Sequence, residues 1–232
     1  MTGKPKSTQA AAAATSGAPG APGTAAVVTP DYWPQACQHL ARRDRVMRRL
    51  IPKFGSACLQ SRGDPFVTLA RSVVGQQISV KAAQSVWERF ERLTKRMTPA
   101  AVLRLKTEDM RTAGLSARKV EYLVDLALHF DGGAVTPAAW HDMDDEAIVA
   151  ELVAIRGIGR WTAEMFLMFH LLRPDVLPLD DAGLLKGISQ HYFSGEPVSR
   201  SEARDLAVAW SPWRSVATWY LWRSLDSEPV AY

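Results

Sequence analysis

The sequence predicts an all-α protein, and three observations carry this prediction. First, apolar residues recur at helical spacing in two separate segments, namely Val120, Leu123, Ala127 and Phe130, and then Trp161, Met165, Met168, Phe169 and Leu172. Second, short connections that contain proline separate the helical segments. Third, no segment alternates polar and apolar residues as a strand does, and no Asn-Gly hairpin signal is present.

Four dipeptides are typical of helix starts, because a side-chain oxygen can cap free N–H groups and proline fits the first turn. They are Asp64-Pro65, Thr98-Pro99, Thr136-Pro137 and Ser211-Pro212. Ser199 and Glu202 have the spacing of a capping box, which predicts another start.

The first 30 residues differ in composition from the rest. They are rich in Ala, Gly, Pro, Ser and Thr and contain no aromatic residue, so they cannot bury enough surface to offset the entropy of ordering. We therefore expect residues 1–30 to be a disordered tail and residues 31–232 to form the helical domain.

Composition excludes several classes of protein. The chain has 232 residues, a net charge of +4 and two cysteines, Cys37 and Cys58, which cannot supply a four-cysteine zinc or iron–sulfur site. No apolar run is long enough to cross a membrane, and we expect no membrane association and no cofactor. Two basic stretches, one between Asp31 and Arg62 and one from Lys81 to Lys119, are either solvated helix faces or contacts for a nucleic acid.

A glycine-containing turn between two helical segments is the most informative feature. Ile148, Leu152 and Ile155 predict a helix with one buried face, and Gly157-Ile158-Gly159 follows it. The glycines allow a sharp turn and the close approach of a partner, while Ile158 can anchor the turn in the core. The N-terminus of the next helix is then available to an anion such as a phosphate, although the glycines alone also fit a tight helix–helix turn.

Two adjacent carboxylates, Asp180 and Asp181, follow an extended loop that begins at Pro174. They open a new helical segment, where an acidic residue has an ordinary role in capping and in complementing the helix dipole. On local pattern alone, capping is the better interpretation of both.

The hairpin and the carboxylate together resemble the helix–hairpin–helix, Gly/Pro-rich loop, Asp superfamily of DNA glycosylases. In that superfamily an essential Asp is followed three residues later by an aliphatic core residue, a register that Asp181 and Leu184 fit. The resemblance implies two helical lobes with the active-site cleft between them, a hairpin motif at about residues 148–172 and a catalytic loop at 173–186. It gives Asp181 the catalytic role and leaves Asp180 as the cap.

Four strings resemble the 3-methyladenine DNA glycosylase II branch, in its short form without an N-terminal α/β domain. They lie at residues 74–79, 114–119, 158–163 and 210–215. Trp161 occupies the position where bifunctional members carry a Schiff-base lysine, which implies a base-removing enzyme without lyase activity. The absence of a C-terminal cysteine cluster argues against the iron–sulfur branches.

The resemblance also implies the partner and its contacts. The partner is double-stranded DNA with damaged bases, bound by Gly157, Ile158, Gly159, Arg160 and Thr162, with a monovalent cation on the hairpin carbonyls as a further expectation. The resemblance also implies that Gln77 fills the gap that a flipped nucleotide leaves in the DNA stack. The alternative is that Gln77 caps a helix or makes hydrogen bonds between helices, because the surrounding segment looks buried.

The expected chemistry is cleavage of the N-glycosidic bond of alkylated purines. A carboxylate stabilises the positive charge that develops on the sugar. The expected base pocket consists of Trp161, Trp210 and Trp213, whose indole faces attract a cationic base, with core packing as the alternative for each. Arg214 is expected either to pair with an acid or to contact DNA.

Two other functions stay open at this point. One is a non-catalytic helix–hairpin–helix module that only binds DNA, and the other is a glycosylase for a different lesion. We expect a monomer that acts in the nucleoid of a bacterial cell or in the nucleus of a eukaryotic one.

Overall fold

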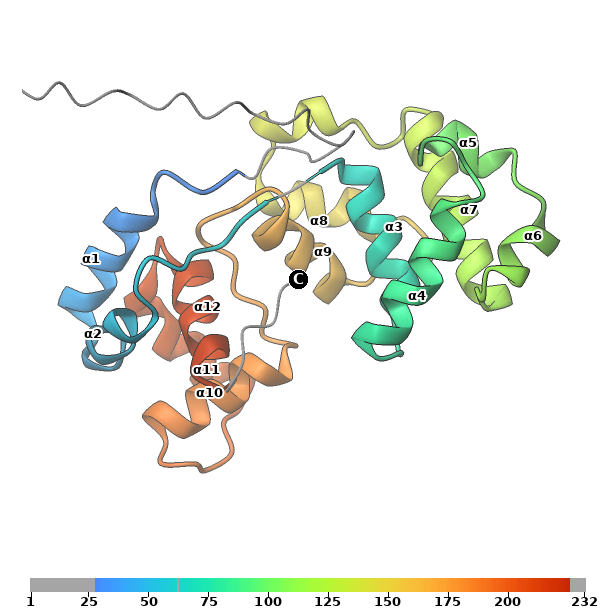
Figure 1. The fold of residues 1–232 in the computed structure, drawn as a ribbon. Coiled ribbons are helices and arrows are strands. Elements are labelled where there is room, and N and C mark those ends of the chain that lie inside the picture. The colour runs from blue at the N-terminus through green and yellow to red at the C-terminus, as the bar shows by residue number, and fades with distance from the viewer. Residues whose placement is uncertain (1–27, 62, 226–232) are drawn as a thin grey trace, which may run out of the picture.

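The computed structural model describes residues 28–61 and 63–225, which form helices and connections without a strand (Figure 1). The predicted all-α class is confirmed. The α-helices are α1 (Trp33–Arg43), α2 (Arg45–Leu50), α3 (Pro65–Gly75), α4 (Val80–Glu91), α5 (Pro99–Leu103), α6 (Thr107–Thr112), α7 (Ala117–Asp131), α8 (Asp145–Val153), α9 (Arg160–Phe169), α10 (Ala182–Tyr192), α11 (Arg200–Ala207) and α12 (Arg214–Leu225). Three short 3-10 helices are η1 (Ile51–Phe54), η2 (Pro137–Asp142) and η3 (Val208–Trp210).

The helices divide into two lobes, each with its own hydrophobic core. Helices α3 to α9 enclose one core and form what we call the central lobe. Helices α1 and α2 join α10 to α12 around the second core, in what we call the terminal lobe. Figure 1 shows this as the blue N-terminal helices lying beside the orange and red C-terminal ones. The two predicted lobes are therefore present.

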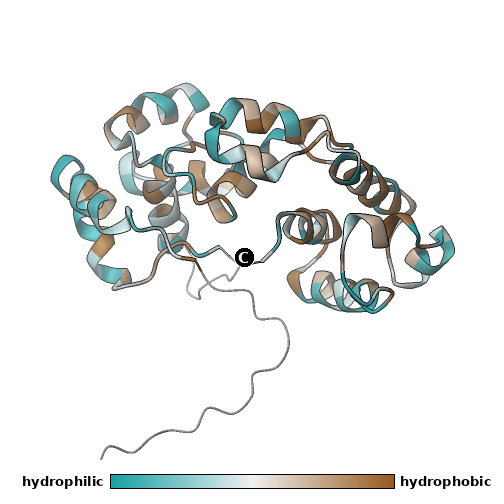
Figure 2. Cartoon of the chain, turned by 90° about the horizontal axis from the view of Figure 1, so that it is seen from above, coloured by the Kyte–Doolittle hydropathy of each residue, from teal (hydrophilic) through white to brown (hydrophobic). Residues whose placement is uncertain are grey.

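Amphipathic helices build both cores. Ile148, Leu152 and Ile155 are all buried, as their spacing predicts. Val120, Leu123 and Ala127 of α7 are also buried. Figure 2 shows that the helices carry both hydrophobic residues (brown) and hydrophilic residues (teal). Burial of one face per helix supplies the main favourable free energy of such a fold.

Most of the predicted caps are present. Asp64 and Thr98 accept backbone N–H groups at the starts of α3 and α5, each followed by proline. Ser199 and Glu202 form the capping box of α11. Thr136 precedes only the 3-10 helix η2, and its side chain makes no cap bond.

The prediction of a helix start at Ser211-Pro212 is wrong. Helix α12 begins at Arg214. Asp175, from a distant loop, accepts the backbone N–H of Arg214 at 3.1 Å and supplies the cap, while the Ser211 hydroxyl donates to the same carboxylate. The cap therefore comes from a tertiary contact that local sequence does not reveal.

The predicted boundary of the N-terminal tail needs one correction. Residues 1–27 of the predicted tail lie outside the described residues. Val28 forms an isolated antiparallel bridge with Ser61, and Pro30 is buried, so the predicted limit of the tail at residue 30 is too late. Across the residues described, no helix combines the length and the apolar character needed to span a membrane.

Candidate functional site

The loop from Arg173 to Asp181 leads from α9 of the central lobe to α10 of the terminal lobe, and hydrogen bonds attach it to both lobes. The Arg173 guanidinium donates to the carbonyl oxygens of Trp140 and Met143 in the central lobe. In the terminal lobe, Asp175 accepts two hydrogen bonds from the Arg214 guanidinium, at 2.7 and 2.8 Å. Of the two roles expected for Arg214, pairing with an acid is the one present here. These contacts fix the path of the loop that ends at Asp181.

Asp181 stands at the start of α10, where three donors surround its carboxylate. Its Oδ1 accepts the Leu184 backbone N–H at 2.6 Å and the Trp222 indole N–H at 2.7 Å. Its Oδ2 accepts the Trp161 indole N–H at 2.9 Å. These three hydrogen bonds hold both carboxylate oxygens in place.

The capping role predicted for Asp180 is wrong. Asp181 itself is the N-cap of α10, whereas Asp180 makes an ion pair with Arg200 of α11 at 2.7 Å. At the N-cap position, the Asp181 side chain caps the helix and still faces the two indoles, so capping is compatible with the catalytic role expected for it.

The residues after Asp181 agree with the predicted register. Leu184 is fully buried in the core of the terminal lobe, as an aliphatic residue three positions after the carboxylate should be. Gly183 has a different purpose: a Cβ there would lie 3.1 Å from the Trp222 ring and 3.0 Å from Asp181 Oδ1. The missing side chain lets the indole reach the carboxylate.

Two tryptophans, one from each lobe, face this carboxylate. Trp161 is the second residue of α9 and keeps 43% of its surface exposed, so core packing, the alternative to a pocket role, does not describe it. Trp222 lies on α12 and stacks on Phe169, with ring centroids 5.7 Å apart and an interplanar angle of 13°. Sequence reasoning missed Trp222, because only the packing of α10 against α12 brings it to Asp181.

The other two tryptophans predicted for the base pocket lie elsewhere. Trp210 is fully buried, and its indole N–H donates to Asp44 at 2.9 Å, so its assignment to a pocket is wrong. Trp213 stacks on Tyr32 at 5.5 Å against the core of the terminal lobe. Core packing, the alternative for both, describes their surroundings.

The hairpin between α8 and α9 has the predicted glycine turn. Gly157 has a φ of +85°, which favours glycine, and Ile158 is buried as the expected anchor. Gly159 is the N-cap of α9 and supplies no side-chain cap, and a Cβ on it would meet nothing within 4 Å. The first N–H groups of α9 therefore face an open space beside a glycine.

Two residues predicted to contact DNA are engaged within the protein. The Arg160 guanidinium donates to Glu146 and to Glu164, the second at 3.0 Å. The Thr162 side chain is buried, so the predicted contact of this residue with DNA could come only from its backbone N–H in the first turn of α9, and it stays a prediction. The helix dipole and the backbone of α9 are left as the anion-binding elements of the hairpin.

Gln77 lies in an exposed turn between α3 and α4, and the expectation of a buried segment around it is wrong. Its φ is +59°, and its neighbour Ile78 is 40% exposed. The preceding Gln76 turns inward and donates its amide N–H to the Gly157 carbonyl at 2.9 Å.

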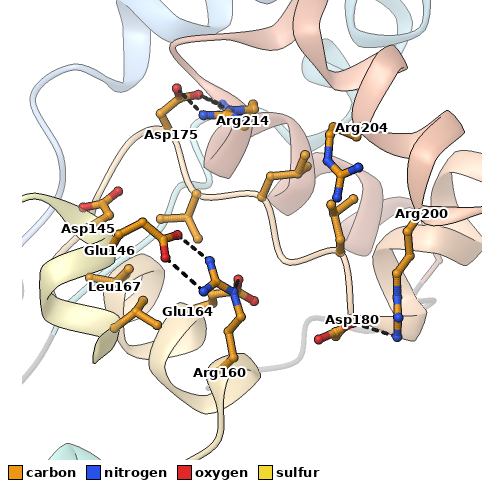
Figure 3. Close-up of a pocket in the computed structure, with 14 residues that line it drawn as sticks. Asp145, Glu146, Arg160, Glu164, Leu167, Asp175, Asp180, Arg200, Arg204 and Arg214 are labelled. Carbon is orange, nitrogen blue, oxygen red and sulfur yellow. Dashed lines mark hydrogen bonds and ion pairs between the residues drawn. The ribbon is translucent and has the colours of Figure 1, made fainter. Parts of the chain in front are cut away.

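A cavity of about 660 Å³ lies at the junction of the lobes, on the side of the loop that carries Asp180 (Figure 3). Charged residues dominate its lining, including the pairs Asp175–Arg214, Glu146–Arg160 and Asp180–Arg200. Glu164 also faces it and is 6% exposed, and burial raises the pKa of its carboxyl group. Asp181 does not line this cavity, which is therefore distinct from the space beside Trp161.

Metal-binding features are sparse. The described residues contain no group of three or more His, Cys, Asp or Glu side chains placed to hold an ion. In the hairpin, the carbonyls of Ile155 and Gly157 already accept the Ile158 N–H and the Gln76 amide, so a monovalent cation would have to use their second lone pairs. The predicted cation at the hairpin stays a prediction.

Chemically, the site presents a fixed carboxylate beside an exposed indole face at the junction of two lobes. A carboxylate with fixed donors is already oriented before a reaction begins, so it can stabilise a nearby positive charge without reorganisation. A flat cationic group against Trp161 would meet the negative face of the indole. The hairpin offers a separate point for an anion.

Comparison with known proteins agrees with this geometry. Residues 70–212 match the family model of the HhH-GPD superfamily base excision DNA repair proteins. The chain is 31% identical over 194 residues to DNA-3-methyladenine glycosylase 1 of Schizosaccharomyces pombe, covering 80% of this chain and 85% of that one.

Solved structures of two proteins are also similar to this chain. A DNA-3-methyladenine glycosidase from Bacillus halodurans superposes with a TM-score of 0.78 at 33% identity, over 87% of this chain and 93% of that one. A Schizosaccharomyces pombe 3-methyladenine DNA glycosylase in complex with abasic DNA superposes with a TM-score of 0.71 at 29% identity, over 85% of this chain and all of the other. The chain therefore belongs to the HhH-GPD superfamily of base excision DNA repair proteins.

Proposed function

We propose that this protein is a monofunctional DNA glycosylase that removes alkylated purines from double-stranded DNA, with Asp181 as the catalytic carboxylate. The observation that carries the proposal is the fixed position of Asp181 between the indoles of Trp161 and Trp222. Relatives named 3-methyladenine glycosylases support the choice of substrate.

In the proposed reaction the flipped nucleotide places its sugar beside Asp181 and its base against the exposed face of Trp161. Cleavage of the glycosidic bond builds positive charge on the sugar, and the carboxylate stabilises that charge and orients the attacking water. A methylated purine already carries a positive charge, so it departs without a strong general acid.

In this proposal the hairpin binds the DNA backbone. The N–H groups at the start of α9, beside Gly159, bind a phosphate close to the lesion. Gln77, at the tip of its exposed turn, enters the space that the flipped nucleotide leaves. Both contacts are independent of sequence, as a repair enzyme requires.

The decisive experiment compares Asp181→Asn with Asp180→Asn on a duplex that contains 7-methylguanine. We expect Asp181→Asn to lower the rate of base release about a hundredfold or more, because it removes the charge beside the sugar. Asn is also a good N-cap, so α10 and the affinity for DNA should be preserved.

Asp180→Asn is the matched control, with the same charge change one residue away at an exposed ion pair with Arg200. It should retain most of the activity. An inactive Asp180 variant beside an active Asp181 variant would contradict the assignment. If the wild-type protein released no base, the alternative of a module that only binds DNA would be favoured. If it released neutral bases such as hypoxanthine in preference to 7-methylguanine, it would be a glycosylase for another lesion.

The absence of lyase activity has its own test. Residue 161 is a tryptophan, so the amine that forms a Schiff base in bifunctional relatives is missing at this position. Borohydride reduction during the reaction should therefore trap no covalent protein–DNA adduct, and the abasic strand should remain intact. A trapped adduct would assign the lyase step to another lysine and overturn this part of the proposal.

A further inference from the structure

The connection between α3 and α4 is a type II β-turn with an unusual residue at its third position. The Ile78 N–H donates to the Gly75 carbonyl, Gln76 has φ −54° and ψ 131°, and Gln77 has a φ of +59°. A type II turn favours glycine at the position of Gln77, because a side chain there is strained. Strain of this kind persists only where neighbouring contacts hold the backbone in place.

Two side chains hold this turn from either side. Gln76 donates its amide N–H to the Gly157 carbonyl at 2.9 Å, across 81 residues of sequence. Lys119, near the start of α7, donates its ammonium N–H to the Val74 carbonyl at 2.8 Å. Both donors are partly buried, so these bonds are shielded from competing water.

The same helix α7 also supports the glycine hairpin. Asp125 accepts the backbone N–H of Arg156 at 2.8 Å. The ring of Tyr122 lies so close to Gly157 that an added Cβ would be 2.2 Å from it. One rigid helix thus carries both the hairpin and the end of α3, and Gln76 joins the two directly.

We propose that Gln76 is a positioning residue that fixes the exposed Gln77 turn at a set distance from the phosphate-binding hairpin. The inference rests on the proposed function of these two elements. With the hairpin seated on a phosphate, Gln77 then stands at a defined depth in the duplex. Gln76 itself faces Gly157 and touches no DNA, so it acts through Gln77. Lys119 supports the same turn from the side of α7.

The test uses Gln76→Glu, which keeps the size of the side chain but replaces the donating amide with a carboxylate that repels the Gly157 carbonyl. Base extrusion is followed by the fluorescence of 2-aminopurine placed beside a lesion in a duplex, and binding is followed with an undamaged duplex. We expect extrusion and the single-turnover rate of base release to fall about tenfold, the loss of roughly one hydrogen bond. Affinity for undamaged DNA should change by less than about threefold, since the phosphate contacts remain.

A double-mutant cycle separates positioning from a general structural role. In the Gln77→Ala background, Gln76→Glu should have no further effect on extrusion, because it acts only through Gln77. Gln84→Glu is the matched control, because it makes the same change on the neighbouring helix α4. There the Gln84 amide N–H donates to the Glu88 carboxylate and not to the hairpin. It should leave extrusion unchanged.

Gln76→Met keeps the length of the side chain without a charge and serves as the second variant if Gln76→Glu does not fold. Additive effects of the changes at residues 76 and 77, or an equal loss of affinity for undamaged DNA, would overturn the inference. Failure of the proposed function would look different, because the wild-type protein would then extrude and release no base.

Discussion

The two glycines of the hairpin are required for different physical reasons. Gly157 lies in the left-handed region, with a φ of +85°, and its Cα lies against the Tyr122 ring. Gly159 has an ordinary φ of −92° and open space where a side chain would be. The packing against Tyr122 explains the first glycine, whereas no neighbouring atom of the described residues excludes a side chain at the second.

Substitution of each glycine should therefore have a separate effect. Gly157→Ala forces a methyl group into the Tyr122 ring and should lower the free energy of unfolding by about 2 kcal/mol or more. Gly159→Asp provides a good N-cap and should leave the melting temperature nearly unchanged. Its charge faces the proposed phosphate, so affinity for damaged and undamaged duplexes should both fall about tenfold or more.

Thermal melting and binding titrations on both variants check this contrast. If Gly159→Asp lost only its preference for lesions and kept its general affinity, the phosphate would have to be bound elsewhere.

At the scale of single elements, the loop between α9 and α10 depends on one buried hydroxyl. Ser215 is fully buried, and its Oγ donates to the Arg173 carbonyl at 2.6 Å and accepts the Val176 N–H at 2.9 Å. Its own backbone N–H donates to the Pro174 carbonyl. The start of α12 thus holds the loop that delivers Asp181.

Ser215→Ala would leave a buried N–H and a buried carbonyl without their partner. We expect the free energy of unfolding to fall by about 1–3 kcal/mol. The rate of base release should fall as well, because the loop that positions Asp181 loosens. Chemical denaturation together with single-turnover kinetics measures both effects, with the exposed Ser201→Ala as control; unchanged stability would show that the loop does not depend on this hydroxyl.

Local pattern predicted the all-α class and three of the helix caps, because spacing and capping are properties of neighbouring residues. Asp64, Thr98 and Ser199 all cap the helices that follow them. Ser211 does not, because the cap of α12 is Asp175, 39 residues away along the chain. The same limit explains Trp222, whose bond to Asp181 spans 41 residues.

At the scale of the whole molecule, contacts between distant parts of the chain create the site. The first two helices pack with the last three, and the terminal lobe they form presents Asp181 and Trp222 to Trp161 of the central lobe. The register of Asp181 and Leu184 could be obtained from sequence by resemblance. The burial of Trp210 could not, since it depends on Asp44, 166 residues earlier.

The junction between the lobes also holds a carboxylic acid that should affect stability as the pH changes. Glu164 has one oxygen bonded to Arg160 and the other buried without a partner. Burial raises the pKa of this carboxyl group, Arg160 lowers it, and the nearby Asp180 and Glu146 raise it further. The folded protein therefore holds this proton more tightly than the unfolded chain does.

The sign of the effect follows from that difference. Between the unfolded pKa of Glu, about 4.3, and the raised pKa of the folded state, folding retains a proton, so the contribution of Glu164 to stability falls as the pH rises through this window. Glu164→Gln keeps an acceptor for Arg160 and removes the ionisation. Its stability relative to the wild-type protein should therefore increase from pH 4 to pH 7. Denaturant titrations across this range measure the difference, which would stay constant with pH if the Glu164 carboxyl titrated equally in the folded and unfolded states. His170, whose pKa burial lowers, contributes to both proteins and cancels in the comparison.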